Sequence, residues 1–148
     1  MTSGWLYNNF GIDAFGLAFV LGHSGELPLS KALLISPIIS HEKMLSHLAR
    51  TTTSILSFEK YLIENISKFS NFNQRYYDSL INSVNAIQLL HELQVVEVVG
   101  DSVSLQKKLS FSSSMGTRAG RIFKASQNIS EILRTPSEVL YLNLRIEL

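Results

Sequence analysis

The hydrophobic period of this sequence changes once, near residue 94, and this change constrains the fold more than any other feature. From about Asn73 to Leu93, apolar side chains recur at the three- and four-residue spacing of a helix. In Val95 to Leu105, two β-branched runs flank Gly100 and Asp101, a pair that accepts the positive φ of a two-residue turn. The sequence therefore predicts a long helix that leads directly into a β-hairpin. The side of this helix that is predicted to face the core, its inner seam, consists of Tyr77, Leu80, Val84, Ile87 and His91, with Ile81 and Leu90 beside it.

Further helices are predicted by the same spacing. We therefore expect a mainly α fold, built as one compact helical domain. The predicted helices are about Asn9–Leu21 (with Phe10, Ala14, Leu17, Ala18 and Leu21 inward, ended by "GHSGE"), Ser40–Ala49, Ile55–Phe69 and Arg118–Leu133 (with Ile122, Ala125, Ile129 and Ile132 inward).

Two prolines punctuate the apolar stretch between the first two predicted helices. Pro28 suits the first turn of a helix, because its missing N–H would be unpaired there anyway. Pro37 should push Ser36 away from helical geometry, and so end or kink the segment.

The C-terminal segment supports two interpretations. Alternating apolar residues from Leu140 to Leu148 are typical of a half-buried strand. Thr135, Pro136 and Glu138 instead form a capping box with proline at the first helical position. The favoured prediction is a short helix that leads into an extended tail.

Length and composition indicate one domain. A chain of 148 residues that is 45% hydrophobic can bury one core of ordinary size. We expect four parts: a flexible N-terminus (1–7), a proline-interrupted helical part (8–50), helices plus hairpin (51–106), and a basic loop, helix and tail (107–148). Only 17% of the residues are charged, which suggests that a partner covers some apolar surface.

The expected location is the cytoplasm. The chain has no cysteine, which fits a reducing compartment. No basic residue precedes Lys31, so no charged secretory leader is expected, and the apolar run Ala14 to Gly22 is too short to span a membrane.

The sequence offers little for catalysis. "HEKMLSH" resembles the zinc motif HExxH, but His41 and His47 are six residues apart, about 240° around a helix, and cannot chelate one ion together. No Walker loop and no GxSxG motif is present. We therefore predict a protein that is not an enzyme, without metal or cofactor, in which His41 could cap or orient the kink made by Pro37. A small hydrolase centred on His41 is a weaker alternative.

Positive charge is concentrated late in the chain. Between Ser102 and Ser130 there is no acidic residue. This zone could contact DNA backbone or an acidic partner, or be a solvated loop. Its basic residues are Lys107, Lys108, Arg118, Arg121 and Lys124.

The long helix and hairpin resemble the recognition helix and wing of a winged-helix domain. A DNA-reading helix needs Arg or Lys for phosphates and base edges. After Arg75, however, no basic residue occurs until Lys107, and the acidic residues in between are Asp78, Glu92, Glu97 and Asp101. Protein contact is therefore the better prediction for this unit, and a winged-helix DNA-binding transcriptional regulator is the alternative function.

The order of features from about Asn8 to Arg145 resembles the middle component of three-component ABC ATPase systems, the Lamassu-type group of bacterial defence. The resemblance rests on the hydrophobic pattern of "LPLSKALLISPIISHEKML", chiefly Leu27, Pro28, Leu29, Pro37 and His41. It implies a non-catalytic adaptor that bridges an SMC- or Rad50-like ATPase and an effector, commonly a nuclease, in anti-phage or anti-plasmid defence. DNA would then be reached through the complex, and no membrane would be involved.

Overall fold

The computed structural model describes residues 11–148 and is mainly helical, as predicted, with a small antiparallel sheet. Both the predicted flexible segment 1–7 and the predicted start of the first helix, including Phe10, lie outside the described residues. The elements are α2 (Ile12–Ser24), β1 (Glu26–Pro28), α3 (Leu29–Ala32), α4 (Ile35–Ile39), α5 (Glu42–Leu48), α6 (Phe58–Glu64), η2 (Ile66–Phe69), α7 (Phe72–Glu92), β2 (Val96–Val99), β3 (Ser102–Leu105), η3 (Ser113–Met115), α8 (Thr117–Ile132) and α9 (Ser137–Asn143).

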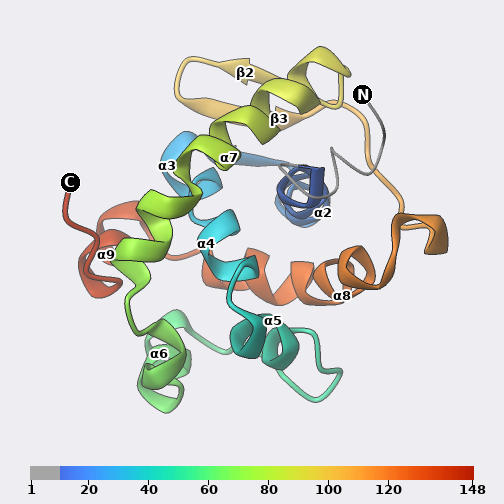
Figure 1. The fold of residues 1–148 in the computed structure, drawn as a ribbon. Coiled ribbons are helices and arrows are strands. Elements are labelled where there is room, and N and C mark those ends of the chain that lie inside the picture. The colour runs from blue at the N-terminus through green and yellow to red at the C-terminus, as the bar shows by residue number, and fades with distance from the viewer. Residues whose placement is uncertain (1–10) are drawn as a thin grey trace.

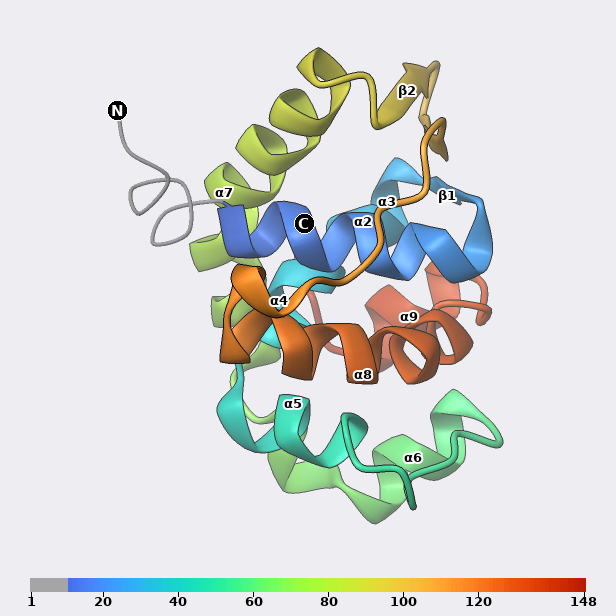
Figure 2. The same cartoon turned by 90° about the vertical axis from the view of Figure 1, so that its right-hand side faces the viewer.

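Helix α2 is the centre of the fold. It packs against α8, α7 and α4, and Figures 1 and 2 show it lying above α8. Gly16 leaves no room for a side chain beside α4, because a Cβ added there would come within 2.7 Å of Ile39 Cδ1. The predicted inward residues from Ala14 onward are confirmed, and α2 is buried on nearly all sides through Ala14, Gly16, Leu17, Ala18, Phe19, Val20 and Leu21.

The first helix ends later than predicted and leads into a strand that the sequence reasoning missed. Helix α2 continues through Gly22 and ends before Gly25, whose φ of 76° favours glycine. Strand β1 then pairs with β3, so the sheet has the order β1-β3-β2. Pro28 ends this edge strand, where a missing N–H is tolerated. It is also the N-cap of α3, which corrects the predicted first-turn position.

The break or kink predicted at Pro37 does not occur there. The interruption falls earlier, at the turn Leu33–Leu34, and both Ser36 and Pro37 lie inside α4. Pro37 is the third residue of α4, where a backbone N–H has no partner within the helix. Proline is therefore compatible with this first turn, despite the restriction that it places on Ser36.

The long helix and the hairpin are confirmed, with α7 followed by β2 and β3 around the turn at Gly100 and Asp101. The predicted inner seam is confirmed only in part. Ile87 and Leu90 are buried, and Leu80 is partly buried against the core. The buried residues of α7 are Phe72, Tyr76, Ser83, Ala86, Ile87 and Leu90, whereas Tyr77, Ile81, Val84 and His91 are exposed.

The predicted helix from Ile55 to Phe69 is divided in two. Helix α6 begins at its N-cap Ser57, whose side chain accepts a hydrogen bond from the Lys60 N–H at 3.1 Å. It ends at Asn65, whose backbone leaves helical geometry with φ −132°, and η2 follows. Helix α8 matches its prediction closely, with Ile122, Ala125, Ile129 and Ile132 buried.

The C-terminal segment forms the short helix α9 rather than a strand from Leu140. Pro136 is the N-cap, and no side chain caps the helix, so the predicted capping box does not form. The following tail lies against α7, because Asn73 Oδ1 accepts the Glu147 N–H at 2.8 Å and the Tyr77 hydroxyl donates to the Glu147 carbonyl. These two bonds determine how the tail is held.

Candidate interaction surfaces

The two histidines of α5 already have hydrogen-bond partners. His41 is the N-cap of α5, and its Nδ1 accepts the Met44 N–H at 3.1 Å. It therefore caps this helix and not the predicted kink at Pro37, through which α4 continues. His47 Nδ1 lies 2.9 Å from the Tyr61 hydroxyl. In residues 11–148, no group of three or more His, Cys, Asp or Glu side chains could hold a metal ion.

A further histidine pairs with a buried serine that is distant in sequence. His23 Nε2 lies 3.0 Å from Ser126 Oγ, and the Ser126 hydroxyl donates to the Phe123 carbonyl at 2.6 Å. Because a hydroxyl has one proton to donate, His23 must be the donor in this contact. The histidine therefore does not activate this serine as a base would, and the bond instead joins α2 to α8. No local sequence signal reveals a pair 103 positions apart.

The predicted basic residues do not converge on one site. Arg121 forms a salt bridge with Glu42 and lies 3.4 Å from Ser46 Oγ, so it holds α5 against α8. Lys107, Lys108, Arg118 and Lys124 are exposed.

Two of these cations lie toward opposite ends of α2. Burial raises the pKa of Asp13, while a Ser36 hydrogen bond and the Arg118 charge oppose this rise. Burial lowers the pKa of His23, and the Lys108 charge lowers it further. Asp13 and His23 are about 15 Å apart along α2 at 1.5 Å per residue, so Arg118 and Lys108 do not form a single patch.

The first cation of α7 is used inside the molecule. The Arg75 guanidinium donates to the Pro37 carbonyl through Nε and Nη2, and to the Lys68 and Ser70 carbonyls through Nη1. It also lies 4.7 Å from the centre of the Phe72 ring. Burial lowers the pKa of Arg75 to about 10. This side chain therefore fastens α7 to α4 and η2 and is not presented to a nucleic acid.

The outer face of α7, defined by Tyr77, Ile81 and Val84, is apolar and exposed. Their exposed fractions are 42%, 75% and 51%, at the spacing of one helix face. Val98 and Val99 on β2 are exposed as well. The acidic residues Asp78, Glu92, Glu97 and Asp101 are all exposed on α7 and the hairpin. An apolar face with acidic neighbours fits contact with a protein better than contact with phosphates.

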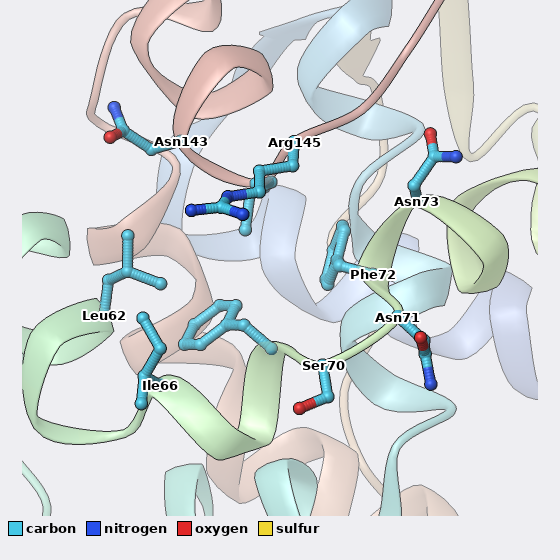
Figure 3. Close-up of a pocket in the computed structure, with 10 residues that line it drawn as sticks. Leu62, Ile66, Ser70, Asn71, Phe72, Asn73, Asn143 and Arg145 are labelled. Atoms are coloured by element: carbon cyan, nitrogen blue, oxygen red, sulfur yellow. The ribbon is translucent and has the colours of Figure 1, made fainter.

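A cavity of about 330 Å³ lies where α6, η2 and the start of α7 meet the C-terminal tail. In Figure 3 the Arg145 side chain extends across it, with Leu62 and Ile66 on the opposite wall. Three asparagines also line it, and Phe69 and Phe72 contribute apolar surface. The cavity thus combines one guanidinium with side-chain amides and an apolar wall.

An apolar groove of about 520 Å³ lies beside the predicted proline segment. Pro28, Leu29 and Leu33 line one side, and Tyr76 and Tyr141 line the other. The Tyr141 hydroxyl donates to the Ser30 carbonyl at 2.6 Å, and burial raises the pKa of Tyr141. Of the five residues that carry the family resemblance, Leu27 and Pro37 are buried in the core, Pro28 and Leu29 line the groove, and His41 caps α5.

Comparison with known proteins identifies the family of this chain. No curated protein and no solved structure matches this chain. Within residues 11–148, no helix combines the length and apolar character that crossing a bilayer would need. The family model of the ABC-three component (ABC-3C) system Middle Component 3 matches residues 17–148. This match covers every described element from the middle of α2 onward, and the chain therefore belongs to the ABC-3C system Middle Component 3 family.

Proposed function

We propose that this chain is a non-catalytic adaptor that bridges an SMC- or Rad50-like ATPase and an effector nuclease. The complex would be of the Lamassu type, act in the cytoplasm and defend against phages or plasmids. The family assignment supports a role among the components of one system. The adaptor role itself rests on the surface of the molecule, and above all on the outer face of α7.

The outer face of α7 is the observation that carries this proposal. A helix in the middle of a small domain usually directs its apolar stripe to the core and its polar residues to water. Helix α7 does bury one face, yet Tyr77, Ile81 and Val84 remain exposed on another. Exposed apolar residues at helical spacing are typical of a surface on which another protein docks.

We assign this face to the ATPase subunit. The acidic residues on α7 and the hairpin should repel nucleic acid and favour a partner surface that has basic residues around an apolar centre. Because apolar surface is left uncovered in the isolated chain, we expect it to be poorly soluble alone and more stable with the ATPase.

Co-purification with the ATPase subunit tests this assignment. Ile81→Glu places a charge in the middle of the outer face and should abolish co-elution in size-exclusion chromatography. Gln127→Glu adds the same charge at an exposed position of α8 and should leave co-elution intact. If the wild-type chain is a well-behaved monomer that never co-elutes with the ATPase, the proposal fails.

A winged-helix DNA-binding regulator is the alternative, since a long helix next to a three-stranded sheet with the order β1-β3-β2 favours it. It predicts salt-sensitive DNA binding by the chain alone, lost when Lys107, Lys108 and Arg118 are changed to Gln. Arg121 is left unchanged in this test because it holds Glu42. No mobility shift at low salt would exclude this alternative.

A further inference from the structure

A third cavity, which we call the α5 pocket, gathers cations from two parts of the chain. It has a volume of about 300 Å³, at the lower end for small-ligand sites. Helix α5 and the residue after its C-cap provide most of the lining, and η2 provides one lysine. The lining residues are Glu42, Lys43, Ser46, His47, Arg50 and Lys68.

The three cations of the α5 pocket have no carboxylate partner in the described part of the chain. Residues 11–148 contain two salt bridges, Arg121–Glu42 and Arg134–Glu131, and neither involves Lys43, Arg50 or Lys68. Lys68 Nζ donates one hydrogen bond, to Asn65 Oδ1 at 3.0 Å. Unpaired cations that line one cavity repel each other, so an anion there would relieve the repulsion.

The acidic residue of the pocket is already paired with Arg121, which is not a lining residue. Glu42 accepts hydrogen bonds from Arg121 and from Ser46, and the Arg121 hydrogen bond is the main reason that the pKa of Glu42 is lowered. Three cations and one carboxylate leave the lining residues with a net charge of +2.

His47 adds an imidazole to the same wall. Its Nδ1 lies 2.9 Å from the Tyr61 hydroxyl, which holds the ring in place. Burial, followed by the charges of Lys68 and Arg50, lowers the pKa of His47 and so favours the uncharged imidazole.

We propose that the α5 pocket binds a phosphate monoester through Lys43, Arg50 and Lys68. A terminal phosphate carries close to two negative charges at neutral pH, which matches the net charge of the lining. Its three terminal oxygens can accept from three cations at once. A carboxylate has one charge and two oxygens, and would leave a cation unpaired. The ligand is either a free nucleotide or the phosphorylated end of a nucleic acid strand, and the site does not depend on the adaptor role.

Binding to the full chain can be measured by titration calorimetry with four probes. These are adenosine 5′-monophosphate, a short single-stranded oligonucleotide with a 5′-phosphate, the same oligonucleotide with a 5′-hydroxyl, and a glutamate-rich peptide. We expect one or both phosphomonoester probes to bind at least about tenfold tighter than the hydroxyl oligonucleotide and the peptide. The stronger of the two identifies the source of the phosphate.

Variants that change the net charge of the α5 pocket in opposite directions test whether its cations bind the phosphate. Lys43→Gln combined with Lys68→Gln should weaken phosphomonoester binding by at least about tenfold, whereas Glu42→Gln should strengthen it because a negative charge is removed. Lys124→Gln, at an exposed site on α8, should change nothing. A merely structural role would make the Glu42 and lysine variants change binding in the same direction. The proposal would be overturned if neither phosphomonoester bound measurably, if both bound no tighter than the hydroxyl oligonucleotide, or if the peptide bound tighter than both.

Discussion

Helices α2 and α7 pack against each other, and their apolar residues are used differently. Helix α2 is apolar on nearly every side, and the fold buries nearly all of it between α4, α7 and α8. Helix α7 is amphipathic, yet its outer face still exposes Tyr77, Ile81 and Val84. Apolar content alone therefore does not distinguish residues that build the core from residues that remain available to a partner. Position around the helix axis decides it.

The largest expected effect comes from making the same truncation at a buried and at an exposed isoleucine. Ile129 on α8 is fully buried, so Ile129→Ala should lower the free energy of unfolding by about 2–5 kcal/mol. Ile81→Ala removes the same atoms from the outer face of α7 and should change it by no more than about 0.5 kcal/mol. Urea denaturation measures both. Equal losses would mean that the outer face belongs to the core.

A smaller effect is expected from the close packing of α2. Gly16→Val should cost about 1–3 kcal/mol, because its added atoms would meet Ile39 and Ile122. Gly22→Val is the matched control, since the Lys108 side chain is the nearest group to a Cβ placed there. Thermal unfolding of the two variants should rank Gly16→Val as the less stable. The reverse order would show that α2 tolerates larger side chains at its crossing with α4.

The smallest effect concerns the point where the buried segment returns to the surface at α5. His41→Ala removes the N-cap and should cost about 1 kcal/mol at neutral pH. His41→Asn retains a side-chain acceptor and should cost less. Denaturation midpoints of both variants and the wild type, measured side by side, would check this ranking. Equal losses in the two variants would mean that the cap contributes nothing.

The same residue gives this cap a pH dependence. Burial, followed by the charges of Arg75, Lys43 and Lys68, lowers the pKa of His41 from its usual 6.5. The unfolded chain therefore binds this proton at a higher pH than the folded chain. The stabilisation is complete above 6.5 and is lost as the pH falls below that value. Denaturation midpoints should fall less on acidification in His41→Asn than in the wild type.

Local sequence signals predicted the elements better than they predicted which sides face inward. The Gly100–Asp101 turn and the helices on either side of the core follow from nearest neighbours in sequence, and the structure confirms them. Part of the α7 seam was misplaced because large apolar residues were assumed to be buried. The buried face includes the small Ser83 and Ala86 beside Ile87 and Leu90, and the choice of face depends on partners distant in sequence.

The candidate sites depended even more on tertiary structure. The run from Lys107 to Lys124 looks like a basic zone, yet Arg121 is paired with Glu42 of α5. Of the others, Lys107 and Lys108 follow β3, whereas Arg118 and Lys124 lie on α8. Lys43, Arg50 and Lys68 are scattered in sequence, but the fold brings them to one cavity. Strand β1 was missed for a similar reason, because three residues ending in Pro28 give no alternating pattern until β3 lies beside them.

The Arg75 guanidinium has a mechanical consequence. It bonds to carbonyls of α4, of η2 and of the turn before α7 at the same time, so α7 cannot roll about its own axis without breaking contacts in three segments. A force applied to α7 at Ile81 would therefore be transmitted through Arg75 to α4 and η2. A protein bound to the outer face of α7 would thus act on the packed interior of the domain rather than on a loose surface element.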